Sequence, residues 1–183
     1  MTAFLRIAHG ADVMPVLLDL QRAPHLWDQN RTRREYPDTP HGQMTDIWVR
    51  FRPARDIVDL DSHREEYRCV FWPAWRELPA LRPLVFAMMS RVSAVELGSI
   101  LITRLPPGGE ILTHSDRGGW APEFYNTKCH LTLAGSSRST CDGETVAMSQ
   151  GEVWTFDNLL SHSIANAGDC DRIVCIVSMR CEA

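Results

Sequence analysis

Hydrophobic and polar positions follow two different patterns along the chain, and the change between them falls near Val95. Before that point, apolar residues recur at intervals of three and four, which is the spacing of a helix that buries one face. This spacing predicts a short helix over residues 15–22 and a second one beginning near residue 81. Residues 62–65, Ser-His-Arg-Glu, are typical of a capping box at the start of a further helical turn. The apolar positions of the second helix are Leu81, Leu84, Val85, Met88 and Val92.

After Val95 the chain becomes a series of short apolar segments separated by turn residues. Strong turn signals are Pro-Pro-Gly-Gly at 106–109, Gly-Ser at 135–136 and Asp-Gly at 142–143. Short strands at near-regular spacing favour a closed or sandwiched antiparallel architecture such as a jelly roll, with the N-terminal helices covering one face. Residues 47–51 predict an additional edge strand. The predicted strands of this half are 98–105, 110–114, 127–134, 137–141, 144–148, 152–156, 162–166 and 171–179.

Length and composition fit one compact domain. Of the 183 residues, 44% are hydrophobic and 23% are charged, as in ordinary globular proteins. We expect a single domain over residues 1–183, in which 1–94 form a mixed helical and irregular N-terminal part and 95–183 form the β core. The six cysteines include no CxxC pair, so we expect free thiols and no zinc cluster.

Charge and hydropathy argue against two classes of partner. The 19 Lys and Arg residues against 23 Asp and Glu leave a net charge of −4, which removes the simplest electrostatic case for nucleic-acid binding. No apolar run approaches the roughly 18 residues that a membrane helix needs. The first residues also lack the apolar core of a secretory signal. We therefore expect a cytoplasmic protein that acts on a small molecule or a peptide.

Three potential metal ligands stand out in the strand-rich half: His114, Asp116 and His162. Residues i and i+2 of a strand point to the same face, so His114 and Asp116 can present an imidazole and a carboxylate side by side. His162 must come from another strand, and a barrel brings distant strands to one interior. Two imidazoles and one carboxylate form the facial triad of non-haem Fe(II) oxygenases, which leaves coordination positions open.

Basic residues lie in the same half, and each has two interpretations. Arg172 begins the apolar strand predicted over 171–179. If it is buried, it needs an anionic partner, and a dicarboxylate co-substrate suits its bidentate guanidinium. Otherwise it is a surface residue at a strand end, paired with Asp169 or Asp171. Lys128 and His130 share a strand face and can bind an anion if that face is interior, whereas on an exterior face they are only solvated.

Two segments resemble the aspartyl/asparaginyl β-hydroxylase family. The first is I-T-R-L-P-P-G-G-E-I-L-T-H-S-D at 102–116, and the second is G-E-V-W-T-F-D-N at 151–158, followed by His162, Asn166 and Asp-Arg-Ile at 171–173. The likeness covers about residues 98–180. It implies a mainly β, double-stranded β-helix fold of the cupin-like, jelly-roll kind. It also implies an enzyme that depends on Fe(II) and 2-oxoglutarate and consumes dioxygen.

The resemblance further implies roles for individual residues. Arg172 matches the arginine that binds the distal carboxylate of 2-oxoglutarate, and Thr103 occupies the position of a hydroxyl residue that assists it. Lys128 and His130 match the family's R-x-H pair near the proximal carboxylate. Lysine here replaces arginine, so a point charge stands where a planar fork is usual. The positions that match the metal-binding triad are His114, Asp116 and His162.

Three further segments are ambiguous. The aromatic residues of 117–125, which follow the triad directly, could cover a substrate or only pack the barrel mouth. The polar and aromatic stretch 41–50 could reach the site from the N-terminal part or form only an edge strand. The arginine cluster at 31–34 is expected to be solvated surface.

Taken together, the sequence predicts a dioxygenase that hydroxylates an unactivated C–H bond, with an aspartyl or asparaginyl residue or an amino-acid-like compound as the suggested substrate. Two alternatives stay open, and neither uses 2-oxoglutarate. One is a cupin-like metal-dependent enzyme that binds its substrate directly on the metal, and it would not need Arg172. The other is a ligand-binding barrel, in which substitution of the triad would leave ligand binding unchanged.

Overall fold

The computed structural model describes residues 2–35, 37–53, 69–117 and 124–182. The capping box expected at 62–65 and residues 118–123 of the segment after the triad lie outside the described residues. The helices within the described ranges are α1 (Met14–Arg22), the 3-10 turn η1 (Pro24–Leu26), α2 (Thr32–Glu35), α4 (Ala74–Glu77) and α5 (Leu81–Arg91). The strands are β1 (Phe4–Ala8), β2 (Thr45–Phe51), β3 (Val70–Phe71), β4 (Ala94–Leu105), β5 (Glu110–His114), β6 (Thr127–Ala134), β7 (Ser136–Cys141), β8 (Glu144–Ser149), β9 (Val153–Phe156), β10 (His162–Ala165) and β11 (Arg172–Cys181).

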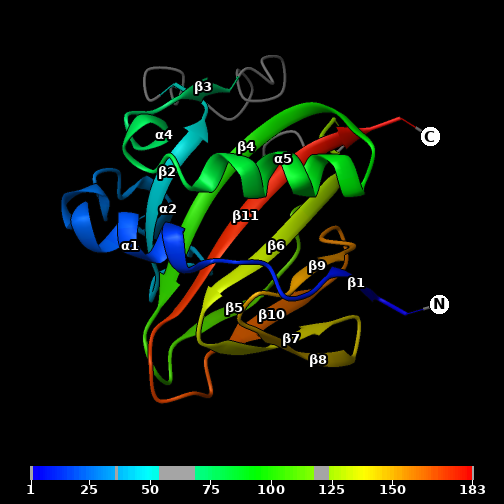
Figure 1. Cartoon of the computed structure of the whole chain (residues 1–183). Helices are drawn as coiled ribbons and strands as arrows, with labels where there is room; N and C mark the ends of the chain where they lie inside the picture. The colour runs from blue at the N-terminus through cyan, green and yellow to red at the C-terminus, as the bar shows by residue number, and fades with distance from the viewer. Residues whose placement is uncertain (1, 36, 54–68, 118–123, 183) are drawn as a thin grey trace.

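The strands form two antiparallel sheets that face each other (Figure 1). The larger sheet has the order β1-β9-β6-β11-β4-β2-β3, and the smaller sheet has the order β5-β10-β7-β8. From β4 onward the chain passes repeatedly between the sheets, so that β4 pairs with β11, β5 with β10 and β6 with β9 around the hairpin β7–β8. This nested pairing is the strand order of a double-stranded β-helix, or jelly roll. The predicted mainly β, cupin-like fold class is confirmed.

The N-terminal part adds strands to both edges of the larger sheet. β1 was not predicted; it pairs with β9. β2 was predicted as an edge strand, but it lies between β4 and β3. The edge position was therefore wrong, because the two residues of β3 pair with Arg50 and Phe51 at the end of β2. The strands after residue 95 agree with prediction to within a few residues, since turn residues bound each of them.

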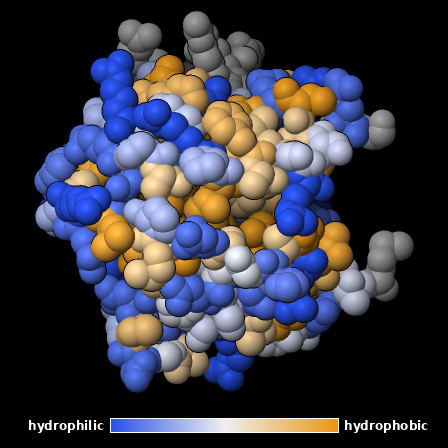
Figure 2. Space-filling view, viewed as in Figure 1, coloured by the Kyte–Doolittle hydropathy of each residue, from blue (hydrophilic) through white to orange (hydrophobic). Residues whose placement is uncertain are grey.

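The helices α1, α4 and α5 cover the outer face of the larger sheet, as predicted (Figure 1). Side chains alternate along each strand, so Ile100 and Ile102 of β4 face the helices whereas Leu101 and Thr103 face the space between the sheets. Burial of large apolar side chains in this layer, at about 1.5–3 kcal/mol each, is its main stabilising contribution. On the helix-covered surface, apolar side chains gather over α4 and α5 among polar ones (Figure 2).

Two further features concern the cysteines and the lengths of the helices. All six cysteines are free thiols, as predicted, and four of them are buried. Within the described ranges, no helix combines the length and the apolar character that crossing a membrane requires.

The space between the two sheets is unusually polar for a protein core. Polar side chains are mostly exposed in globular proteins, so a group of them at an inner surface indicates a binding site. Several of these side chains lie on the inner faces of β4, β6, β7 and β11 and are at most 4% exposed. They are Thr103, His130, Thr132, Ser137, Ser139 and Arg172.

Gly135 connects β6 to β7 and fixes the position of the first residues of β11. Its φ is +70°, and an added Cβ would lie 2.8 Å from the carbonyl oxygen of Asp171 and 3.2 Å from the Cα of Arg172. Gly135→Ala is expected to lower the free energy of unfolding by about 2–4 kcal/mol, because the left-handed backbone and the contact both oppose a side chain.

Gly143 provides the matched control. Its φ is +81°, but a Cβ would meet nothing within 4 Å. Gly143→Ala should therefore cost only the conformational penalty of about 1–2 kcal/mol. Urea denaturation of both variants measures the difference, and equal losses would show that the contact with β11 has no energetic role.

Candidate metal centre

The three predicted metal ligands come together where β5 ends and β10 begins in the smaller sheet. His114 ends β5 and His162 begins β10, and the two residues are paired partners in the antiparallel register. Asp116 follows two residues after His114, on the same side of the chain. The candidate ligand atoms of all three residues lie within 4.8 Å of one another. The HxD motif and the distant histidine are thus placed as the pattern predicts.

Both histidines are oriented by their own strands. Nδ1 of His114 donates to the carbonyl oxygen of Leu112 at 2.7 Å, and Nδ1 of His162 donates to that of Leu160 at 2.9 Å. In the neutral imidazole, a donating Nδ1 leaves the lone pair on Nε2 available to a metal. Burial lowers the pKa of His162, which favours this neutral form.

Asp116 is held from the other side by Lys128 and Asn158. The Lys128 ammonium and the Asn158 amide, at 2.7 Å, both donate to Oδ2, and the backbone N–H of Asp116 donates to the carbonyl oxygen of Asn158 at 2.9 Å. Oδ1 lies 3.8 Å from Nε2 of His114. Burial alone would raise the pKa of Asp116, but the charge of Lys128 and the hydrogen bonds to Oδ2 hold that pKa well below its usual range. Asp116 is therefore ionised, with Oδ1 on the side of the histidines.

The sequence did not predict a role for Asn158. Its uncharged amide can be removed to test whether the position of the Asp116 carboxylate matters for metal binding. Asn158→Ala is expected to weaken divalent-metal binding by about 10–100-fold, because partners of a ligating carboxylate contribute that much to affinity. Titration with Mn(II), followed by electron paramagnetic resonance, measures the change. Asn126→Ala, which removes an amide bonded to Cys181, is the control and should bind as the unaltered protein does. Unchanged affinity in Asn158→Ala would show that the bond from Asn158 does not position a ligating carboxylate.

Arg172 lies fully buried at the start of β11, so the surface interpretation is wrong. Its three guanidinium nitrogens have no hydrogen-bond partner among the described residues. Asp171 instead lies 3.9 Å from Arg104. Burial lowers the pKa of Arg172 to about 10, so the group still carries its charge at neutral pH. An unpaired charge in a protein interior is costly, and this one requires an anion.

The surroundings of Arg172 also have unused hydrogen-bonding capacity. His130 faces the interior. Burial lowers the pKa of His130, and the positive charge of Arg172 contributes to lowering it further. Neither ring nitrogen of His130 has a partner in the described part of the chain, and the same holds for the hydroxyl of Thr132. The hydroxyl of Thr103 is buried on the neighbouring strand, 3.5 Å from the carbonyl oxygen of Val174. This region is chemically suited to a polar, anionic ligand.

Asn166 holds the loop that precedes Arg172 through hydrogen bonds of its side chain. Its amide donates to the carbonyl oxygens of Leu105 and Cys170, both at 2.9 Å, and its oxygen accepts from the N–H of Gly168 at 3.1 Å. These bonds tie the end of β10 to the ends of β4 and β11.

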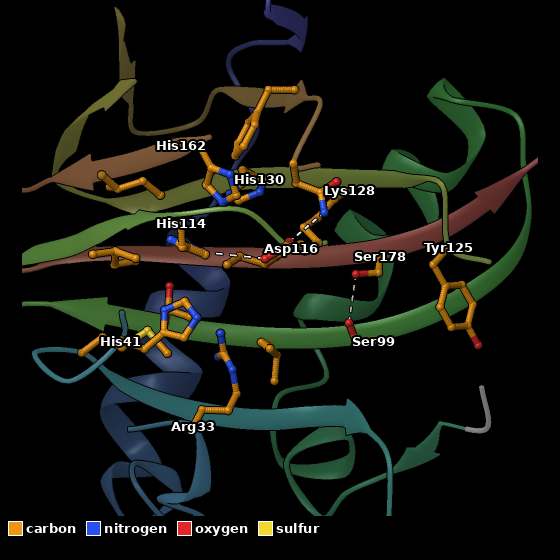
Figure 3. Close-up of a pocket in the computed structure, with 18 of the residues that line it drawn as sticks. Arg33, His41, Ser99, His114, Asp116, Tyr125, Lys128, His130, His162 and Ser178 are labelled. Carbon is orange, nitrogen blue, oxygen red and sulfur yellow. Dashed lines mark hydrogen bonds and ion pairs between the residues drawn. The ribbon is translucent and has the colours of Figure 1, made fainter. Parts of the chain in front are cut away.

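The triad borders a cavity of about 220 Å³ between the sheets. In Figure 3, Lys128 and His130 lie on one side of His114 and Asp116, and Arg33 and His41 lie on the other. Arg33 was expected to be solvated surface, but it lines the cavity and bonds to the buried Asp46 at 2.9 Å. The remaining walls of the cavity are Met44, Phe51, Ser99, Leu101, Thr103, Ile111, Tyr125, Phe156, Asn158, His162, Ile164, Ile176 and Ser178.

Two of the ambiguous segments contribute to this cavity. His41 reaches the triad, with its ring centre 5.1 Å from that of His114 in an edge-to-face contact. Tyr125 lies at the far end of the cavity beside the hydrogen-bonded pair Ser99 and Ser178 (Figure 3). Trp120 lies outside the described residues.

Comparison with known proteins gives one match that covers most of the chain. The sequence model of the aspartyl/asparaginyl β-hydroxylase family matches residues 65–181. No curated protein matches the chain. Solved structures similar to it include a predicted oxalate decarboxylase from Thermotoga maritima (22% identity, 52% of this chain and 73% of that chain covered, TM-score 0.37). A cupin superfamily protein from Desulfitobacterium hafniense (14%, 47% and 69%, 0.36) and the Cnp3 cupin domain from Schizosaccharomyces pombe (16%, 47% and 58%, 0.38) are also similar.

Proposed function

The chain belongs to the aspartyl/asparaginyl β-hydroxylase family, and on that premise we propose that it is an Fe(II)- and 2-oxoglutarate-dependent dioxygenase that hydroxylates an unactivated C–H bond. The observation that carries the proposal is Arg172, a buried guanidinium without a partner in the described residues, on the strand β11 whose Ile176 and Ser178 line the cavity that the triad borders. A dicarboxylate supplies the anion that this residue lacks, through the bidentate geometry that arginine favours.

The donor set fits the implied metal. His114 and His162 would hold it through Nε2, and Asp116 would hold it through Oδ1, because the other polar atoms of these side chains are already bonded within the protein. Two imidazoles and a carboxylate are the ligands typical of non-haem Fe(II) with open positions. When bound, iron and 2-oxoglutarate supply the chemistry: dioxygen oxidises 2-oxoglutarate to succinate and carbon dioxide, and its second oxygen atom becomes the hydroxyl group of the product.

The chain's own residues bind, orient and exclude water. Arg172 would bind the distal carboxylate of 2-oxoglutarate, with Thr103 as a hydrogen-bonding neighbour, and His130 would bond to the proximal carboxylate. Lys128 keeps Asp116 ionised and oriented, which differs from the anion-binding role that the resemblance implied for it. Apolar side chains around the triad limit access of water to the reacting atoms. They include Ile111, Phe156 and Ile164, which line the same cavity.

Reconstitution of the purified protein tests the proposal. The protein is loaded anaerobically with Fe(II) and 2-oxoglutarate, oxygen is admitted, and succinate is measured against a His114→Ala control. Succinate formation that requires the metal, 2-oxoglutarate and His114 is the expected result. Absence of metal binding, or succinate no higher than in the control, would reject the proposal. A cupin-like metal enzyme that binds its substrate directly on the metal would instead keep its activity in Arg172→Ala.

A further inference from the structure

One wall of the cavity is built by residues that precede the region matched by the family model. The segment Thr39–Met44, here called the N-terminal strap, runs beside β5, the edge strand of the smaller sheet. The backbone N–H of Leu112 donates to the carbonyl oxygen of Pro40 at 3.1 Å, and that of Glu110 donates to the side chain of Gln43 at 3.0 Å. The strap is therefore attached to the strand that ends in His114.

The strap is also bonded to α2, which carries Arg33. The hydroxyl of Thr39 donates to the carbonyl oxygen of Arg33 at 2.7 Å and accepts from the N–H of His41 at 3.2 Å. The N–H of Met44 donates to the carbonyl oxygen of His41 at 3.1 Å. These bonds fix His41 and Arg33 relative to each other and to the triad.

His41 and Arg33 both present polar groups to the cavity. Nδ1 of His41 is buried and has no partner among the described residues. Arg33 donates from Nη1 to Asp46 at 2.9 Å, and its guanidinium carries further N–H donors. The ring of His41 lies 5.1 Å from that of His114 between ring centres, and Arg33 lines the same cavity as the triad.

We infer that Arg33 and His41 form the subsite for the substrate's side chain, and that this subsite takes a carboxylate, so that an aspartyl residue is preferred over an asparaginyl residue. The inference rests on the proposed function. In it, Arg33 is the specificity-determining residue and binds the carboxylate directly, while His41 donates a second hydrogen bond. The strap-side location is separate from the side on which Lys128 and His130 lie (Figure 3).

The balance of charge supports an anionic substrate. Among the described residues that line the cavity, Arg33 and Lys128 are cationic and Asp116 is anionic. With the buried Asp46 behind Arg33 and the buried Arg172, these groups carry a formal net charge of +1. The formal charges of a divalent metal and of the 2-oxoglutarate dianion cancel. A substrate carboxylate removes the remaining positive charge, whereas a carboxamide leaves it uncompensated in a partly desolvated site.

Isothermal calorimetry with two blocked amino acids tests this preference. The probes are N-acetyl-L-aspartate methylamide and N-acetyl-L-asparagine methylamide, which have nearly the same shape and differ in charge. The protein is first loaded with Mn(II) and saturating 2-oxoglutarate without oxygen, so that the co-substrate position is filled. The aspartyl probe is expected to bind at least about tenfold more tightly, the effect of one charge-assisted hydrogen bond. Arg33→Met is expected to reduce the preference to less than about twofold.

Arg34 provides a matched control on the same helical turn. It pairs with Asp28 at 2.7 Å and does not line the cavity, so Arg34→Met should retain the full preference. Because Arg33→Met leaves Asp46 unpaired, the double variant Arg33→Gln/Asp46→Asn is measured beside it and should lose the preference equally.

The result separates the inference from the proposed function. If Mn(II) and 2-oxoglutarate do not load, the proposed function fails and this inference fails with it. If they load but the probes bind equally, the asparagine probe binds more tightly, neither binds, or Arg33→Met keeps the preference, only the inference is overturned.

Discussion

Arg172→Met is expected to weaken 2-oxoglutarate binding strongly and, at the same time, to make the ligand-free protein more stable. The two effects have one cause. Without a ligand, the buried guanidinium has no described partner and its desolvation is not compensated. Methionine has a similar length and no charge, so the substitution should raise the free energy of unfolding by about 1–4 kcal/mol. With 2-oxoglutarate present, loss of a buried charge pair should weaken binding by about 100-fold or more.

Two measurements test this prediction. Calorimetry of the Mn(II)-loaded protein gives the affinity for 2-oxoglutarate, and thermal denaturation with and without 2-oxoglutarate gives the stability. Arg180→Met is the control, because Arg180 lies on the same strand, is only partly buried, and has its Nη1 3.9 Å from a carboxylate oxygen of Glu96. It should change neither quantity appreciably. A destabilised Arg172→Met that still binds 2-oxoglutarate would mean that Arg172 is a structural residue with a partner inside the protein.

The β core could be predicted from local signals, because turn residues and short apolar segments fix where strands begin and end. The triad could be predicted for a similar reason: HxD places two ligands on one face, and the strand pairing of β5 with β10 brings His162 opposite His114. The burial of Arg172 followed from its position at the start of an apolar strand. Each of these expectations depended on the regular geometry of strands rather than on particular long-range contacts.

The N-terminal wall of the cavity could not be predicted in the same way. Arg33 stands among three arginines in four residues, which is the composition of a solvated surface, and only its contact with Asp46 turns it inward. Lys128 was expected to bind an anionic co-substrate, which stays a prediction, but the bond from its ammonium to Asp116 was not expected. A usable signal was present, because Lys128 is the single lysine of a chain that otherwise uses arginine for its cations. A compact ammonium suits contact with one carboxylate oxygen, whereas a guanidinium favours two.

His162→Ala is expected to abolish metal binding without unfolding the protein. His162 is 6% exposed, its Nδ1 is bonded to its own strand, and its ring lies 4.3 Å from that of His114 between ring centres. Loss of a ligand removes more binding energy than loss of a neighbour of a ligand. Mn(II) affinity should therefore fall by more than the roughly 10–100-fold expected for Asn158→Ala.

Mn(II) titration followed by electron paramagnetic resonance measures the loss, and circular dichroism establishes that the sheets remain. His25→Ala is the control, since that histidine is exposed and contacts Glu77 at 2.8 Å, away from the cavity. The ranking of the three variants is the decisive feature. If Asn158→Ala weakened metal binding more than His162→Ala did, the ion would be held around Asp116 without the second imidazole, and the arrangement required for an open Fe(II) site would not exist.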